Sequence, residues 1–165
     1  MAERVLVAFA TKMGSNTEVA NAIAEVLRSA GVEADATPAR FVRDLSPYGA
    51  VVLGSALYAA HWQRDANRFL IRHYEALRAR RLWLYSSGPL DHRLAAQNLP
   101  LTTHAAEIVG DLPYIEHRTF GGRLDPDAAG LDPQILATHP VGDFRNWPAI
   151  RAWAADIAAV VLAGG

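Results

Sequence analysis

Short apolar runs alternate along this chain with segments in which apolar residues recur at helical spacing. Residues 51–53 and 82–85 are apolar at every position, as in strands that are covered on both faces. Strands that alternate with helices pair in parallel, because each helix carries the chain back to the edge where the strand began. The sequence therefore predicts an α/β fold, a parallel sheet with helices on both faces.

The expected elements can be placed along the chain. Strands are predicted at residues 5–10, 32–37, 50–55, 82–86 and 113–120. Helices are predicted at residues 15–30, 62–79, 103–109 and 147–162. Gly31 is typical of a residue that ends a helix, and Pro148 suits the first turn of the last helix. Residues 123–146 are predicted to be irregular, and a loop of that length is usually functional or mobile.

The composition restricts the class of protein. With 165 residues the chain fits a single domain, expected to span residues 1–165. It contains no cysteine, which excludes disulfides and thiolate metal sites. No apolar run reaches the ~20 residues expected of a spanning helix, and no signal peptide is recognisable. These features predict a cytoplasmic protein without a transmembrane segment.

The charges argue against two classes of site. A formal net charge of −1 does not favour binding to nucleic acid. The 6 histidines are scattered without paired spacing near a carboxylate, so no metal site is expected. Arg64, Arg68 and Arg72 share one helix face, because they lie four residues apart. That face is either simply solvated or a docking stripe for an acidic redox partner.

Residues 11–18, Thr-Lys-Met-Gly-Ser-Asn-Thr-Glu, join the first predicted strand to the first helix. A helix N-terminus favours an anion through its free N–H groups and its dipole, and these hydroxyl and amide side chains add neutral donors. No lysine follows Gly14 as a Walker loop requires, and one glycine is too few for a dinucleotide fingerprint. The loop therefore suits a single terminal phosphate. The alternative is an ordinary helix cap, with Ser15 and Glu18 as a capping box.

Other predicted strand ends share this chemistry. Residues 54–62, 86–89 and 120–122 are rich in small, hydroxyl or aromatic residues and poor in charge. Ligands of parallel α/β sheets bind outside the carboxyl ends of the strands. We therefore expect these segments and the first loop to line one site.

The residues at 11–17 resemble the FMN-phosphate loop of flavodoxins, Thr-x-x-Gly-x-Asn/Thr. Together with residues 51–58 and the His-Trp pair that follows, and with residues 85–90, 120–125 and 143–147, they resemble one branch of flavodoxin domains. That branch contains the menaquinone-dependent protoporphyrinogen IX dehydrogenases. The resemblance covers nearly the whole chain. It implies a three-layer flavodoxin-like fold, a five-stranded parallel sheet in the order 2-1-3-4-5, and one non-covalent FMN.

The resemblance also implies roles for individual residues. The first loop would hold the phosphate, residues 55–62 would run along one side of the isoalloxazine, and residues 86–90 would contact its pyrimidine edge. Tyr58 and Trp62 either stack on the flavin or pack in the core. His61 is a candidate proton donor or substrate contact, against a solvated residue at the rim. The residues assigned to the cofactor are Thr11, Lys12, Met13, Gly14, Ser15, Asn16, Thr17, Ser55, Ala56, Leu57, Tyr58, Ala59, Trp62, Ser86, Ser87, Gly88, Pro89, Leu90 and Gly122.

Two features depart from the family. Ala60 stands where the family often has glycine, and alanine resists a positive φ. Residues 123–146 are acidic and proline-rich where the dehydrogenases carry a basic insertion. The expected function is an FMN-dependent oxidoreductase that exchanges electrons or hydride with a small organic substrate, quinone- or porphyrinogen-like. The alternatives are an electron carrier between protein partners and a cofactor-free assembly domain, and the oligomeric state is open.

Overall fold

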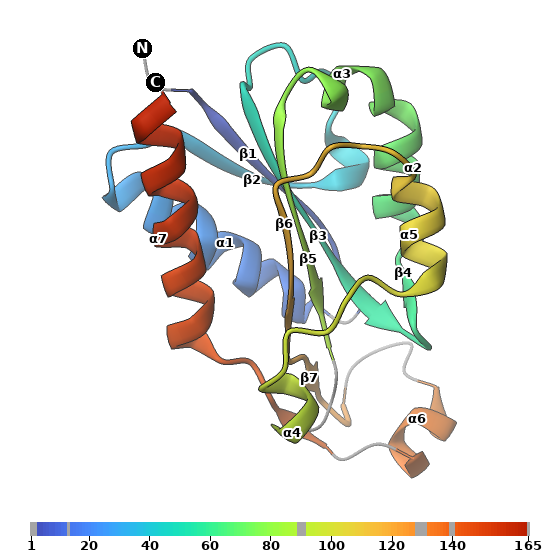
Figure 1. Cartoon of the computed structure of the whole chain (residues 1–165). Coiled ribbons are helices and arrows are strands. Elements are labelled where there is room, and N and C mark those ends of the chain that lie inside the picture. Colours follow the sequence, from blue (N-terminus) through green and yellow to red (C-terminus); the bar gives the residue numbers. More distant parts are fainter. Residues whose placement is uncertain (1–2, 13, 89–91, 128–131, 139–140, 165) are drawn as a thin grey trace.

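The computed structural model describes residues 3–12, 14–88, 92–127, 132–138 and 141–164. Its main sheet has parallel strands in the order β2-β1-β3-β5-β6, and a short strand, β4, pairs antiparallel with β3 (Figure 1). The strands of this sheet are β1 (Val5–Ala10), β2 (Ala34–Pro38), β3 (Ala50–Tyr58), β4 (His61–Trp62), β5 (Arg81–Ser87) and β6 (Glu116–Phe120). The five parallel strands confirm the predicted order 2-1-3-4-5.

Helices cover both faces of the sheet (Figure 1). α1 (Ser15–Ser29) and α7 (Trp147–Gly164) lie on one face. α2 (Arg64–Arg72), α3 (Tyr74–Arg78) and α5 (Thr103–Val109) lie on the other. These layers form the three-layer flavodoxin-like fold that was expected.

Both faces of the strand β1 are buried, which explains why its sequence is apolar at every position. Val5, Val7 and Phe9 belong to the core beneath α1 and α7. Leu6 and Ala8 belong to the core beneath α2 and α5. Successive side chains of a strand point to opposite faces, so a strand between two helix layers must be apolar at every position.

One helix, α7, is long and apolar enough to cross a membrane by length and composition alone. It has 18 residues, which is shorter than the run of ~20 apolar residues expected of a spanning helix. Ile150, Trp153, Ile157 and Val161 recur at helical spacing and are buried in the core. The apolar composition of α7 is therefore the pattern of a helix that packs against a sheet.

The ends of two helices are as predicted. Gly31 follows α1 with a φ of 93°, and the amide of Val32 donates to the carbonyl of Leu27 (3.0 Å). This is the Schellman arrangement, in which a left-handed glycine lets the chain satisfy the last helical carbonyls. Pro148 lies in the first turn of α7.

Two predicted segments differ in the structure. The helix expected at residues 62–79 is two helices, because His73 leaves the helical conformation with φ −105° and ψ 15°. The buried ring of His73 packs 4.8 Å from the ring of Phe69, between centroids.

The segment 123–146 was expected to be irregular, but it contains regular elements too short to produce a periodic pattern. They are β7 (Arg123–Leu124), which pairs antiparallel with β8 (Gly142–Asp143), and α6 (Pro133–Thr138). Two further short elements were not predicted, η1 (Ala39–Phe41) and α4 (His92–Ala95).

The turn between β3 and β4 consists of Ala59 and Ala60, and both have positive φ, 51° and 62°. A two-residue hairpin turn with two positive φ angles favours asparagine and glycine. The left-handed conformation costs an L-residue about 1–2 kcal/mol. Alanine therefore adopts at Ala60 the backbone conformation that it was expected to resist.

We expect Ala60→Gly to raise the free energy of unfolding by about 0.5–1 kcal/mol, because it relieves this strain. The gain is smaller than the strain itself, since glycine also gives the unfolded chain more freedom. Urea unfolding measures the difference. Ala152→Gly, at an exposed position inside α7, is the matched control and should lower stability by about 1 kcal/mol. A comparable loss in both variants would argue against strain in the turn.

Candidate cofactor site

The loop between β1 and α1 is folded around the hydroxyl of Thr11. This oxygen accepts hydrogen bonds from the amides of Gly14 (3.0 Å) and Asn16 (3.4 Å). Gly14 has a φ of 82° and is the N-cap of α1, and no side chain caps the helix. Ser15 is the first helical residue, so the capping-box alternative is wrong. Among the described residues the hydroxyl of Thr11 is the side-chain acceptor at the N-terminal end of α1, and this neutral group brings no negative charge to the positive end of the helix dipole.

Asn16 supports the loop from inside. Its side chain is fully buried, and Nδ2 donates to the carbonyl of Ala10 (3.0 Å). Its Oδ1 and the hydroxyl of Tyr85 are both buried without a hydrogen-bond partner among the described residues. Burial raises the pKa of Tyr85 far above its ordinary value, so the phenol stays neutral. Asn16 thus fixes the shape of the loop through the end of β1.

The hairpin formed by β3 and β4 lies beside this loop. The Nζ atom of Lys12 is 3.6 Å from the centroid of the Tyr58 ring, a cation–π contact. Tyr58 is half-buried, whereas Trp62 is only 3% exposed and belongs to the core. The placement of Trp62 favours core packing over flavin stacking. Tyr58 is the aromatic side chain of the hairpin that remains open to a ligand.

A buried hydrogen-bond chain joins the hairpin to β5 and β6. The indole N–H of Trp62 donates to Oγ of Ser86 (2.9 Å), which lies 2.9 Å from Nε2 of His117. The hydroxyl of Ser86 can donate or accept, so Ser86 donates to Nε2 when that nitrogen is unprotonated and accepts from it when Nε2 carries the ring proton. Burial lowers the pKa of His117 to about 4, consistent with a neutral ring. Sequence reasoning missed His117, because one histidine in a strand gives no signal.

The half-buried imidazole of His117 makes stability depend on pH. Its pKa is about 4 in the folded protein, against about 6.5 in an unfolded chain. Between these values the unfolded state binds more protons, so the free energy of unfolding should fall as the pH is lowered from about 6.5 to about 4. His117→Gln should flatten this interval of the pH–stability curve. Urea unfolding across the interval measures it, and an unchanged slope in the variant would refute the assignment.

Two predicted serines have different surroundings. The hydroxyl of Ser55 accepts from the amide of Gln63 (2.8 Å) and donates to the carbonyl of Ala56 (3.0 Å), so it holds the start of α2. The hydroxyl of Ser87 is buried and has no hydrogen-bond partner among the described residues. An unsatisfied buried polar group costs about 1–3 kcal/mol, which a polar ligand group at this place would recover. Gly88, at a φ of 116°, is buried next to it.

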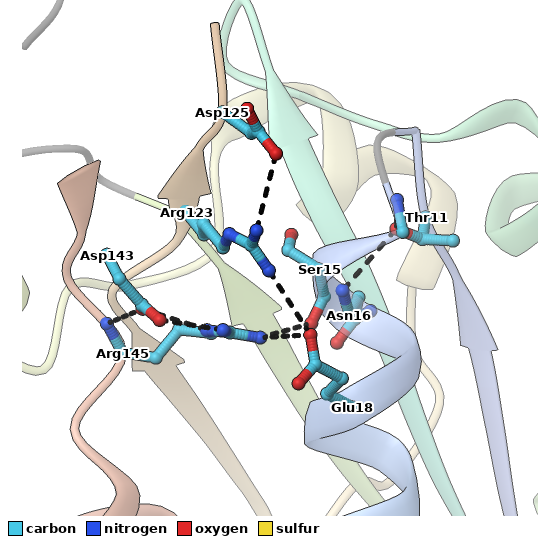
Figure 2. A network of polar contacts seen from close by, with 9 residues as sticks. Thr11, Ser15, Asn16, Glu18, Arg123, Asp125, Asp143 and Arg145 are labelled. Atoms are coloured by element: carbon cyan, nitrogen blue, oxygen red, sulfur yellow. Dashed lines mark hydrogen bonds and ion pairs between the residues drawn. The ribbon is translucent and has the colours of Figure 1, made fainter. Parts of the chain in front are cut away.

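Two arginines from the segment between β6 and α7 reach the first turn of α1 (Figure 2). The side chain of Arg145 is 3% exposed and donates to the carbonyl of Ser15 (3.1 Å). It also pairs with Glu18 (3.2 Å) and Asp143 (2.7 Å), and these contacts raise its pKa. Arg123 forms a second pair with Glu18 (3.5 Å). This network, which the sequence did not reveal, ties β7 and β8 to the helix end that carries the loop.

The other predicted residues are placed as follows. His61 is exposed, and its ring lies 4.6 Å from that of His104, between centroids. Gly122 is buried, and its carbonyl accepts from the amide of Phe144 (2.8 Å). In the described part of the chain, no group of three His, Cys, Asp or Glu side chains could hold a metal ion. Outside the described residues lie Met13, Pro89 and Leu90.

Contacts bring the four strand ends together at one edge of the sheet. Lys12 joins the first loop to the hairpin, and the bond from Trp62 to Ser86 joins the hairpin to β5. The amide of Gly88 donates to the carbonyl of Phe120 (2.7 Å), which joins β5 to β6. The segments expected to line one site therefore do lie together, while their contacts with a cofactor stay a prediction.

The model of the Flavodoxin domain family matches residues 6–130. The chain belongs to the flavodoxin domain family. Membership implies FMN as the cofactor, and two observations fit this group: the helix N-terminus that follows the hydroxyl-rich loop, and the buried hydroxyl of Ser87, which has no partner among the described residues. Among curated proteins, none matches this chain.

Several solved structures share the fold of this flavodoxin domain. A flavodoxin from the domain Archaea is 14% identical with a TM-score of 0.61, over 96% of this chain and 99% of that one. Flavodoxin 2 from Bacillus cereus is 15% identical with a TM-score of 0.61, over 98% and 99%. Rubredoxin oxygen:oxidoreductase from Desulfovibrio gigas is 14% identical with a TM-score of 0.65, and 97% of this chain spans only 36% of that protein. At such identities the likeness shows the fold alone. Neither the family nor these structures support the protoporphyrinogen dehydrogenase branch.

Proposed function

We propose that this flavodoxin domain binds one FMN at the carboxyl edge of its sheet and uses it to transfer electrons. The observation that carries the proposal is the hydroxyl-rich loop folded around Thr11 at the N-terminus of α1, which contains no acidic residue between Thr11 and Thr17. A helix N-terminus of this kind suits a phosphate that keeps its own charge. The bound flavin would supply the redox chemistry, and the protein would hold and orient it.

The residues divide these tasks by position. Ser15 and Thr17, on the first turn of α1, would contact the phosphate through side-chain hydroxyls and amides. Tyr58 would flank the ring from the hairpin. Ser87 would give its hydroxyl to the polar edge of the ring, and Gly122 would lie near the outer rim. The assignment of Ser87 is supported by its buried hydroxyl, which lacks a partner among the described residues.

For the substrate we propose a small organic molecule, quinone- or porphyrinogen-like, with exposed His61 as a proton donor at the rim. Arg145 holds the segment between β6 and α7 beside the phosphate loop, and this segment would shield one side of the cofactor from solvent. Such shielding favours an enzyme. The second candidate is an electron carrier between proteins in the cytoplasm, which a basic surface on α2 favours. Both proposals treat residues 1–165 as one domain.

Ser15→Glu tests the phosphate assignment. The new carboxylate would lie at the N-terminus of α1 and repel the phosphate, so FMN affinity should fall at least about tenfold, or 1.4 kcal/mol. Asn21→Glu adds the same charge at an exposed position further along α1 and should keep the affinity. Quenching of FMN fluorescence on titration measures both. Equal losses in the two variants would refute the phosphate assignment.

The wild-type protein tests the wider proposal. Failure to quench FMN fluorescence, together with no stabilisation by FMN on heating, would overturn the redox function and favour an assembly domain. If FMN binds, a reductive titration separates the two candidates. Uptake of electrons one at a time supports the carrier, and uptake in pairs supports the enzyme.

A further inference from the structure

Positive charge is concentrated on two neighbouring segments of the surface, residues 39–43 and 64–72. They contain five arginines and one acidic residue, Asp65, and so carry a net charge of +4, whereas the whole chain carries −1. The first segment includes η1, and the second is α2. The arginines, all of them exposed, are Arg40, Arg43, Arg64, Arg68 and Arg72.

The same segments carry two unusually exposed apolar side chains. Ile71 is 68% exposed and Phe41 is 57% exposed, more than any other large apolar side chain among the described residues. The guanidinium of Arg40 lies 4.6 Å from the centroid of the Phe41 ring. Exposed aromatic and aliphatic side chains beside arginines are the composition of a protein–protein interface.

Specific contacts join the two segments into one surface. Arg72, on α2, donates to the carbonyls of Ala39 (3.3 Å) and Val42 (3.2 Å). At the other end of α2, Asp65 pairs with Arg40 (3.8 Å). Because η1 is held along α2 at both ends, Phe41 and the exposed side of the helix can contact one partner together. We call residues 39–43 and 64–72 the basic surface.

Three arginines of the basic surface are available to bind a partner. The side chains of Arg43, Arg64 and Arg68 form no hydrogen bond or ion pair with any residue in the described part of the chain. A guanidinium binds a carboxylate through two parallel hydrogen bonds, so these side chains match carboxylates of a partner. Their number and spacing provide charge complementarity with an acidic protein.

The basic surface adjoins the candidate cofactor site. α2 begins at Arg64, directly after Trp62 and Gln63, and the amide of Gln63 donates to the hydroxyl of Ser55 in β3 (2.8 Å). A partner that covers the first turn of α2 would therefore lie next to the hairpin that contains Tyr58. The distance from partner to flavin would be short, as electron transfer requires.

We propose that the basic surface docks an acidic protein that exchanges electrons with this domain. Carboxylates of the partner would bind Arg43, Arg64 and Arg68, and an apolar side chain would cover Phe41 and Ile71. The electron exchange rests on the proposed function, whereas the docking does not. Two large apolar side chains and a helix of 9 residues are too few for an amphipathic membrane contact. Nucleic acid would require a broader basic patch.

Binding of a labelled random copolymer of glutamate and tyrosine, followed by fluorescence anisotropy at low salt, tests the proposal. This probe is an acidic polypeptide with aromatic side chains. Arg64→Glu/Arg68→Glu should weaken binding at least tenfold. Phe41→Ser/Ile71→Ser should abolish the preference for the copolymer over polyglutamate. The control Arg28→Glu/Arg151→Glu reverses two charges on the opposite helix layer and should change binding less than twofold.

Each other outcome overturns the proposal. No binding of the copolymer, or equal losses in the control and in Arg64→Glu/Arg68→Glu, would exclude a specific docking surface. Tighter binding to phosphatidylglycerol vesicles or to polyuridylate would replace the protein partner by a membrane or by RNA. The measurement uses the protein without added FMN, so a failure of FMN binding would refute the proposed function and leave this result unaffected.

Discussion

Gly54→Ala should lower the free energy of unfolding by about 3 kcal/mol or more. A Cβ atom at Gly54, in β3, would lie 1.9–2.4 Å from three atoms of the Tyr85 ring. The ring cannot move away, because Tyr85 is fully buried and its ring contacts those of Phe120 and Trp153, with centroids 6.2 and 6.0 Å apart. Overpacking costs most where the neighbours have no space to shift.

Gly49→Ala is the matched control. The three atoms nearest to its Cβ would belong to the flexible side chain of Glu3, the closest at 2.9 Å, so stability should change by less than about 0.5 kcal/mol. Tyr85→Ala removes the ring that clashes, and adding Gly54→Ala to that variant should then cost little more. Urea unfolding of the wild type, Gly54→Ala, Tyr85→Ala and the double variant completes a double-mutant cycle. Additive losses would show that the clash with Tyr85 is not the cause.

Arg145→Met should lower the free energy of unfolding by about 2–3 kcal/mol. The side chain of Arg145 is 3% exposed, and the variant would leave Glu18 and Asp143 without their buried partner. The cost stays below that of a fully buried ion pair, because these two carboxylates are 56% and 45% exposed and water can reach them. The hydrogen bonds from Arg145 lower the pKa of Asp143, so part of the stability should be lost as acid protonates that carboxylate.

Arg123→Met provides the comparison for this network. Its side chain is 41% exposed and pairs with the same Glu18, so its loss should cost less than about 1 kcal/mol. Hydrogen exchange locates the effect, since the amides of β7 and β8 should exchange faster in Arg145→Met than in Arg123→Met. The opposite order would mean that Arg145 does not anchor this segment to α1.

Some features of this domain could be predicted because they depend on local sequence. Alternating apolar runs and helical spacing determined the α/β class and the places of the five parallel strands. The loop at residues 11–17 was recognisable because Thr11 and Gly14 act within a few residues of each other. The left-handed φ of Gly31 follows in the same way from a glycine after an apolar helix.

Other features depend on residues that only the fold brings together. The sequence left Trp62 between flavin stacking and core packing, and its bond to Ser86 across the sheet places it in the core. Alanine at Ala60 argued against a positive φ, but the short connection between β3 and β4 imposes one. At Ala60 the pairing of β3 with β4 outweighs the cost of a left-handed alanine, about 1–2 kcal/mol, whereas at Trp62 a contact across the sheet decides between two alternatives that the sequence left open.

The sequence by itself determined the fold class, the helix that receives the loop at residues 11–17, and the small polar residues at the strand ends. Only the tertiary structure decided the pairing of Arg145 with Glu18, which are 127 residues apart, and the union of η1 with α2 into one basic surface. Periodicity and turn chemistry act over a few residues and can be read along the chain. Buried ion pairs and surface patches join segments that are distant in the sequence, so they form only when the folded sheet brings those segments side by side.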